Sequence, residues 1–131
     1  EIRNSSNVIK KQSRNLKNSL KIYDELKKLV IPTEKAIKKG DYFSLGRIFH
    51  QHWGLKKKLS SNISNKHIDS LYEKGMKLGA YGGKLLGAGS GGFMCFIVDK
   101  NKKKDFIKKF KLLHIPIKLD ITGSQIVYYS Q

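Results

Sequence analysis

The sequence is poor in cysteine, proline and long apolar runs. Its one cysteine, Cys95, excludes an intramolecular disulfide, and a thiol inside an apolar run is expected to be buried. A chain without disulfides suits a reducing compartment, so we expect a cytoplasmic protein. The longest strongly apolar run, Phe93–Val98, is far too short to cross a bilayer, and we expect no membrane partner.

The N-terminus also lacks two common features. Glu1–Ser6 is polar, does not begin with Met and has no signal-peptide pattern. We interpret it as the cut end of a longer protein, although a trimmed chain would look the same.

Acidic residues are scarce, because 27 Lys and Arg face only 10 Asp and Glu and the formal net charge is +17. A field this positive attracts phosphate-bearing partners such as nucleotides, sugar phosphates or nucleic acid. Abundant Lys, Ile and Asn are also typical of compositional drift in an AT-rich genome. The basic residues are scattered through every segment, so both interpretations stay open.

What is present fits one globular domain, since 131 residues that are 39% hydrophobic can build one core but not two. Apolar residues at helical spacing predict a long amphipathic helix that ends before Pro32. A short helix follows from Thr33, its N-cap, to Gly40, its C-cap, and Asp41 caps a third helix that reaches Leu59. The apolar positions behind these predictions are Val8, Ile9, Leu16, Leu20, Tyr23, Leu26, Leu29, Val30, Leu45, Ile48, Phe49, His52 or Trp53, and Leu59.

The pattern changes from helix to strand in the last part of the chain. Ser64 or Asn65 caps a fourth helix that ends near Gly79. Two strands follow over 81–86 and 93–98, and the second is apolar throughout and therefore expected to be covered on both faces. The order predicts an α+β domain in which four N-terminal helices precede a β-β-α-β-β unit with an antiparallel sheet. The remaining elements are a helix over 102–113 with Leu113 on its apolar side, and strands over 115–121 and 125–129 around a turn at 122–124.

The connection between the two central strands is rich in glycine. Ordering so many glycines is unfavourable, but without Cβ atoms successive N–H groups can turn inward and form a nest for an anion. Ser90 adds a hydroxyl donor to this loop. A glycine hairpin that only lets the strands cross closely would have the same spacing, so both interpretations stay open. No Lys-Ser or Lys-Thr follows and a strand comes next, which excludes a Walker loop and a dinucleotide fingerprint. The glycines are Gly87, Gly89, Gly91 and Gly92.

The segment Lys84–Phe93, KLLGAGSGGF, resembles the third conserved motif of the GHMP kinases, which include galactokinase, homoserine kinase, mevalonate kinase and phosphomevalonate kinase. Lys39–Tyr42 with Leu45-Gly46 is similar to the beginning of a helix in the C-terminal domain of that superfamily. Leu59–Asp69 is similar to its serine-capped helix before the glycine motif. The resemblance covers about residues 33–111 and implies a ferredoxin-like GHMP kinase C-terminal domain over 1–131.

Within the superfamily, His50–Lys56 and Gly123–Ile126 look most like the bacterial D-glycero-D-manno-heptose 7-phosphate kinases. This resemblance implies ATP-dependent phosphorylation of the anomeric hydroxyl of a heptose 7-phosphate. The nucleotide-gripping loop and the groups that activate the acceptor belong to the N-terminal domain of the family. We therefore expect no catalytic residue here, ATP and Mg²⁺ held mainly by an N-terminal partner domain, and no activity of the chain alone.

The resemblance also assigns a role to the glycine loop, which would support the ATP phosphates and lie beside the acceptor. Family members often have glycine where Ser90 stands, so serine requires permissive backbone angles. We expect Gly89→Val to cut turnover sharply with little loss of folding. The loop residues are Gly87, Ala88, Gly89, Ser90, Gly91 and Gly92.

Four further residues are candidate contacts for a substrate phosphate. Lys84 precedes the loop, and Lys56 belongs to a basic run over 56–58, of which at least two lysines are expected on a solvated helix face. Ser64 and Asn65 are expected to cap a helix first and to touch substrate second.

Other residues suggest different functions. His50 and His52 point in different directions on a helix, so we predict no metal site. Trp53 could stack on a sugar or base but is expected to be a core anchor. The alternative function is a basic nucleic-acid-binding α+β module, which the expected burial of Phe93 and Phe96 disfavours.

Overall fold

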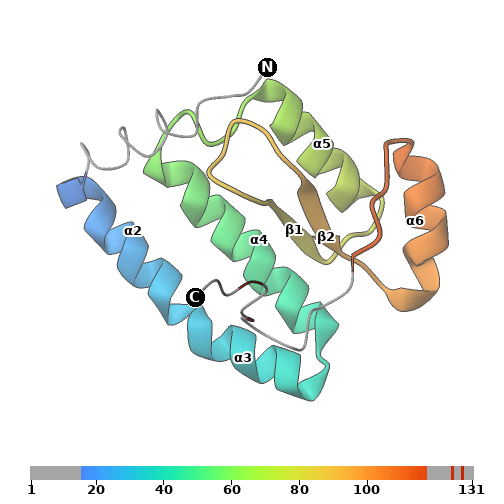
Figure 1. The fold of residues 1–131 in the computed structure, drawn as a ribbon, viewed down its shortest axis with the longest axis horizontal. Coiled ribbons are helices and arrows are strands. Elements are labelled where there is room, and N and C mark those ends of the chain that lie inside the picture. The colour runs from blue at the N-terminus through green and yellow to red at the C-terminus, as the bar shows by residue number, and fades with distance from the viewer. Residues whose placement is uncertain (1–15, 118–124, 126–127, 129–131) are drawn as a thin grey trace.

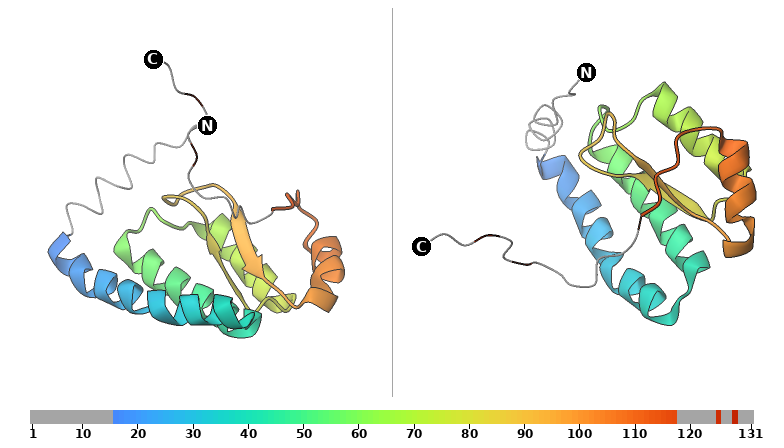
Figure 2. Two further views of the ribbon diagram at one scale, coloured as in Figure 1. Left: turned by 60° about the horizontal axis from the view of Figure 1, so that its bottom comes forward. Right: turned by 45° about the vertical axis from the view of Figure 1, so that its right-hand side comes forward.

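The computed structural model describes residues 16–117, 125 and 128, with side chains from residue 19 onward. Helices lie on both sides of a β-hairpin (Figure 1), with α2, α3 and α4 grouped on one side of it and α6 on the other (Figure 2). This arrangement confirms the predicted α+β class. The elements are α2 (Leu16–Lys28), α3 (Val30–Lys39), α4 (Tyr42–Leu59), α5 (Lys66–Lys77), β1 (Gly82–Leu85), β2 (Met94–Ile97), the 3₁₀ turn η1 (Lys100–Lys102) and α6 (Lys103–Phe110).

The first two helices differ from the predicted ones at Pro32. The helix α2 ends at Lys28, and after a turn at Leu29 the helix α3 begins two residues before Pro32. Proline is tolerated in a first turn, where its missing N–H has no intrahelical partner anyway. Thr33 is therefore not the N-cap that we predicted, and its hydroxyl instead donates to the Leu29 carbonyl at 2.6 Å. The predicted positions Val8 and Ile9 lie outside the described residues.

The end of α3 and the beginnings of α4 and α5 confirm the sequence predictions. Gly40 follows α3 in the left-handed conformation with φ of 64°. The Asp41 carboxylate accepts a hydrogen bond at 3.0 Å from the backbone N–H three residues later and so caps α4. Of the two candidate caps of α5, Asn65 takes the role, and its side chain also accepts from the N–H three residues later at 3.0 Å. Capping side chains and a left-handed glycine, all within a few residues of the helix ends, thus determine where these helices begin and end.

The strands β1 and β2 form the predicted antiparallel hairpin, and one further backbone hydrogen bond extends the ladder at each end. The expectation that the second strand is covered on both faces is wrong in the described part of the chain. Its side chains are only half-buried and Phe93 is 64% exposed, because the helices pack chiefly against β1. Cys95 is likewise half-buried rather than buried, and this burial raises the pKa of its thiol.

The hydrophobic core lies between α4, α5 and the hairpin. Trp53 is 1% exposed and Ile63 is fully buried, which confirms Trp53 as a core anchor. Phe96 joins this core to α6, since its ring packs 5.6 Å from that of Phe106 and 5.5 Å from that of Phe110. The buried residues of the core are Trp53, Leu59, Ile63, Ile68, Tyr72 and Leu85.

The helix α4 and the strand β1 approach each other at two glycines. A Cβ atom on Gly82 would lie 1.8 Å from the carbonyl oxygen of Gly46, and a Cβ on Gly46 would lie 2.4 Å from Cβ of Tyr81. Neither position has room for a side chain. These glycines let a helix backbone lie directly against a strand backbone, which positions the start of the hairpin.

The C-terminal part of the chain departs from the prediction. The helix α6 ends at Phe110, and Leu113 is 89% exposed rather than on an apolar face. Residues 115–117 do not form the predicted strand, and Pro116 there has no N–H to donate to a ladder. The rest of that strand, the turn at 122–124 and most of the strand at 125–129 lie outside the described residues.

Candidate functional site

The glycine-rich loop between β1 and β2 needs backbone angles that most residues avoid. Gly87, Gly89 and Gly92 have φ of 90°, 128° and 123°. Ser90 also has a positive φ, 63°, in the left-handed region. Because L side chains rarely adopt such angles, the glycines are a requirement of this loop conformation.

The loop rests on the segment that leads into α5. The Ser90 N–H donates to the Ile63 carbonyl at 3.1 Å, and the Ser90 hydroxyl donates to the Asn62 carbonyl. Ser90 therefore directs both donors into the protein, whereas the sequence suggested that its hydroxyl faces an anion. Gly89 lies equally close, since a Cβ there would be 2.8 Å from Cα of Ile63. No sequence signal marks these contacts, because the acceptors are backbone carbonyls.

Two of the candidate phosphate contacts hold this supporting segment in place. Asn65 caps α5, as described above. The Ser64 hydroxyl donates to the Asp69 carboxylate at 2.9 Å, and Lys57 forms an ion pair with the same oxygen at 3.0 Å. Ser64 and Asn65 thus stabilise the segment on which the glycine loop rests.

Other loop donors are left for a ligand. Among the described residues, five loop amides donate no hydrogen bond within the chain, while Leu86 N–H closes the ladder by donating to Phe93 O at 2.9 Å. Backbone amides turned toward one space form an anion-binding concavity. The five amides are those of Gly87, Ala88, Gly89, Gly91 and Gly92.

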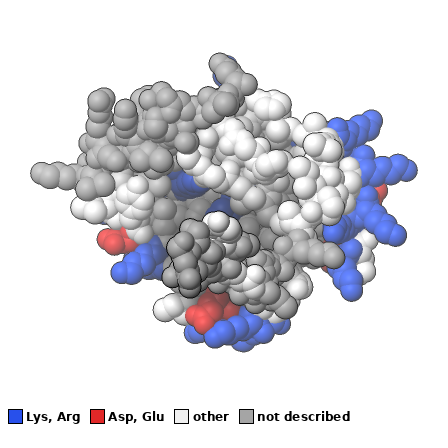
Figure 3. Space-filling model, viewed as in Figure 1, with Lys and Arg blue, Asp and Glu red and all other residues white. Residues whose placement is uncertain are grey.

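A pocket of about 500 Å³ lies beside the base of the loop, between α2, α4 and β1. It brings together His52 and two of the candidate phosphate contacts, Lys56 and Lys84. From the sequence, His52 was considered only for the apolar face of its helix or as a metal ligand. The Lys56 ammonium donates to the Gly87 carbonyl, which ties α4 to the loop. The Lys84 ammonium lies 5.4 Å from the ring centroid of Phe49. The face shown in Figure 3 has basic side chains, Lys or Arg, inside a central hollow.

The pocket is electropositive, and partial burial is the main cause of the lowered pKa values of its basic side chains. Burial, with repulsion from Lys84 and Lys56, lowers the pKa of His52 from 6.5 to about 4. Burial lowers the pKa of Lys84. Burial also lowers the pKa of Lys56, and repulsion from Lys84 is a second, smaller cause there. His52 is therefore neutral at pH 7, and the described residues that line the pocket include no carboxylate. The pocket thus offers cationic and neutral donors to a ligand.

A larger hollow, about 870 Å³, lies between α3, α4 and the start of β1. No residue of the glycine loop lines it. Its Asp41 carboxylate already caps α4, and its His50 bonds the Tyr72 hydroxyl at 2.6 Å. We therefore place the candidate site at the smaller pocket and the loop.

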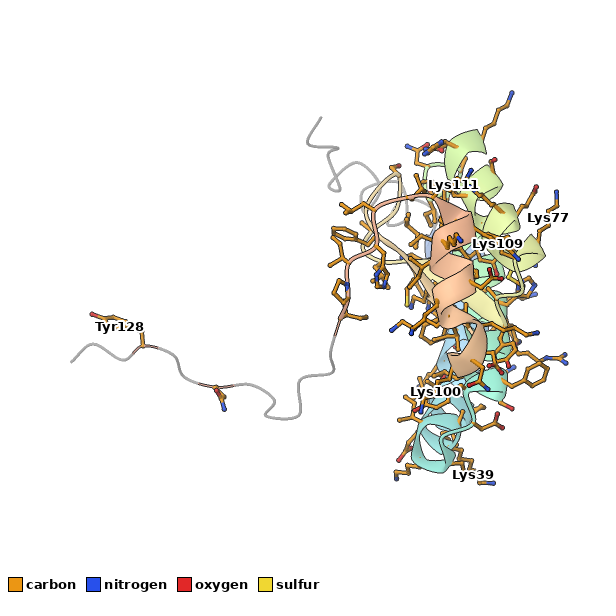
Figure 4. All side chains as sticks on the ribbon, turned by 90° about the vertical axis from the view of Figure 1, so that its right-hand side faces the viewer. Lys39, Lys77, Lys100, Lys109, Lys111 and Tyr128 are labelled. Carbon is orange, nitrogen blue, oxygen red and sulfur yellow. The ribbon has the colours of Figure 1, made fainter. Side chains whose placement is uncertain are left out.

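The remaining lysines are spread over several elements. Figure 4 shows Lys100, Lys109 and Lys111 along the side formed by α6, with Lys77 projecting from α5 and Lys39 at the far end of α3. In the described part of the chain no three His, Cys, Asp or Glu side chains gather as metal ligands. None of the described helices is both long and apolar enough to cross a bilayer. The unbonded loop amides and the two pocket lysines, by contrast, come together at one place, the loop and the pocket at its base.

Ser90 provides a test of the loop geometry. The left-handed conformation costs serine about 1 kcal/mol, and the hydroxyl bond to Asn62 offsets about the same amount. Ser90→Ala keeps the strain and loses the bond, so it should lower the free energy of unfolding by about 1 kcal/mol. Ser90→Gly loses both and should be nearly neutral. Urea unfolding compares the two variants, and an alanine variant as stable as the glycine variant would contradict this loop conformation.

His52 makes stability depend on pH. Between pH of about 4 and 6.5 the unfolded chain binds a proton at His52 that the folded chain does not, so the free energy of unfolding falls as the pH drops through this range. His52→Gln should remove that part of the acid destabilisation, while His67→Gln, at an exposed histidine, should keep it. Urea unfolding at several pH values measures this, and equal acid slopes in both variants would contradict the pocket electrostatics.

The fold and the loop define an α+β domain whose glycine-rich hairpin rests on a helical support. Residues 33–112 match the family model described as GHMP kinases C terminal. The chain therefore belongs to the GHMP kinase family, as its motifs indicated.

Three curated relatives are kinases. The chain is 37% identical to D-glycero-alpha-D-manno-heptose 7-phosphate kinase of Campylobacter jejuni over 71% of this chain and 27% of the relative. It is 40% identical to galactokinase of Pyrococcus furiosus over 57% of this chain and 21% of the relative. It is 32% identical to mevalonate kinase of Methanocaldococcus jannaschii over 72% of this chain and 28% of the relative. The chain thus spans roughly a quarter of the length of these relatives.

Proposed function

We propose that this chain is the substrate-side, C-terminal domain of an ATP-dependent sugar kinase that phosphorylates the anomeric hydroxyl of D-glycero-D-manno-heptose 7-phosphate. Family membership supports a kinase. The 37% identity to a heptose 7-phosphate kinase supports this acceptor. The single observation that carries the proposal is the glycine loop, whose five amides make no hydrogen bond to other described residues beside a cationic pocket.

In this proposal the loop forms one wall of the phosphoryl-transfer site. Phosphoryl transfer relies on positioning and on neutralising the charge of the transferring group, and backbone amides provide both without a titratable group. The N-terminal partner domain holds ATP and Mg²⁺ and supplies the catalytic residues, so none is assigned within 1–131. The cytoplasm, which is reducing and contains ATP, suits this reaction and the single thiol of Cys95.

The proposal predicts how activity is divided between the domains. The full-length protein should phosphorylate the heptose 7-phosphate with ATP, whereas residues 1–131 alone should show no turnover above background, because one wall of the site cannot position the nucleotide. A coupled assay for ADP release with both proteins checks this. The control adds the chain to the full-length enzyme to show that it does not inhibit the assay. Robust turnover by the isolated chain would refute this division.

A further inference from the structure

We propose that the pocket of His52, Lys56 and Lys84 binds the phosphate group that the acceptor already carries, so that the intact kinase selects phosphorylated sugars over free ones. The identity of the ligand rests on the proposed function. The pocket as an anion site rests on its own geometry.

Two ammonium groups share this pocket, and neither forms an ion pair with an acidic residue in the part of the chain that the structure describes. The four ion pairs among the described residues use Lys28, Lys38, Lys57 and Lys109. Lys56 and Lys84 instead enter one hollow from α4 and β1, and no Asp or Glu of the described residues lines it. Two like charges in a partly buried space are unfavourable unless an anion neutralises them. Burial lowers the pKa of both lysines, and repulsion from Lys84 lowers the pKa of Lys56 further.

The pocket reaches the loop only at one end, at Gly87 and Ala88. Gly89, Gly91 and Gly92 carry available amides at or beyond the middle of the loop, while Gly87 and Ala88 line the pocket at its base. One transferred phosphoryl group requires one set of hydrogen-bond donors around it. A second cationic site next to it therefore fits a second phosphate that stays on the acceptor.

The remaining groups of the pocket suit a phosphate ester. An ammonium has three donors, so Lys56 keeps two after it binds the Gly87 carbonyl. His52 lines the same pocket as a neutral imidazole, which adds no third positive charge beside the two lysines. Apolar walls of Tyr23 and Leu26 complete the pocket, which would favour a ligand with an organic body over a free ion.

The test uses Lys84→Gln in the full-length kinase, with Lys58→Gln as its matched control. Lys58 is exposed on α4 outside the pocket, and both changes remove one positive charge. We expect Lys84→Gln to raise KM for the sugar phosphate about tenfold to 100-fold, because a charge-assisted hydrogen bond is lost. KM for ATP and kcat should change by less than about twofold. The reason is that the lost contact binds the acceptor equally well in the ground state and in the transition state. Lys58→Gln should match the parent enzyme.

Four results would overturn the proposal. A rise in KM for ATP would assign the pocket to nucleotide phosphates. An equal effect of Lys58→Gln would show that only the overall field matters. Unchanged KM values in Lys84→Gln would leave the pocket without a ligand. A free heptose that is used as well as its 7-phosphate would show that the pocket does not select phosphorylated sugars.

A second measurement separates this proposal from the proposed function. If the full-length protein phosphorylates no sugar at all, the proposed function fails, and calorimetric titration with mannose 6-phosphate in the absence of nucleotide still tests the pocket. Binding that Lys84→Gln abolishes and Lys58→Gln preserves would support the anion site. Absence of binding to the parent protein would overturn it.

Discussion

Replacing Gly89 by Ala in the full-length kinase is expected to lower turnover about 100-fold, the scale on which a displacement of about 1 Å disturbs a reacting geometry. Gly89 has φ of 128°, and an added Cβ would lie 2.8 Å from Cα of Ile63. The loop must then move away from its support, which also stretches the bond from Ser90 N–H to the Ile63 carbonyl. The amides proposed to contact the transferred phosphoryl group would move with it.

Gly40→Ala is the control for backbone strain alone. Gly40 has φ of 64° but open space around its Cβ position, and it lies at the end of α3 outside the loop and its pocket. This variant should lose about 1 kcal/mol of stability from the left-handed angle and keep normal turnover. Steady-state kinetics and urea unfolding of both variants make the comparison. Normal kinetics of a folded Gly89→Ala enzyme would show that the loop has only a structural role.

The structure also revises the sequence-based expectation for Gly89→Val. From the sequence we expected little loss of folding. Gly89 instead faces the backbone of Ile63, so any side chain there should lower stability as well as turnover. Kinetic comparisons therefore need protein concentrations corrected for the folded fraction.

Replacing Gly46 by Ala is expected to reduce the free energy of unfolding by about 3 kcal/mol, the upper part of the range for overpacking. Its Cβ would lie 2.4 Å from Cβ of Tyr81 and 3.0 Å from the Tyr81 carbonyl carbon. Because the neighbours include strand backbone, α4 and β1 must separate rather than rotate a side chain. A loss of this size is a large fraction of the stability of a small domain.

Gly54→Ala is the matched control on the same helix. Nothing lies within 4 Å of the Cβ position of Gly54, so the substitution adds helix propensity without a collision. It should stabilise the protein by up to about 1 kcal/mol, opposite in sign to Gly46→Ala. Urea unfolding of the two variants measures the difference. A Gly46→Ala protein as stable as Gly54→Ala would show that α4 and β1 do not lie this close together.

The sequence predicted well those features that a few adjacent residues decide. Asp41 and Asn65 cap helices because a short polar side chain reaches an N–H three residues later in almost any context. Pro32 misled the prediction because a proline is compatible both with the end of one helix and with the first turn of the next. The apolar run of β2 predicted a strand but not its exposure, since covering a strand depends on how many elements pack against it.

The hairpin could be predicted from the amino-acid sequence alone, because positive φ angles such as those of Gly87, Gly89 and Gly92 strongly favour glycine. The surroundings of that loop depend on tertiary packing. The Lys56 ammonium donates to the Gly87 carbonyl, 31 residues later in the chain. The Ser90 hydroxyl donates to the Asn62 carbonyl, 28 residues earlier. Such contacts depend on how α4, the segment before α5 and β1 pack together, and their backbone partners leave no pattern in the sequence. The same packing encloses two lysines and a neutral histidine in one pocket, which spacing along the chain could not reveal.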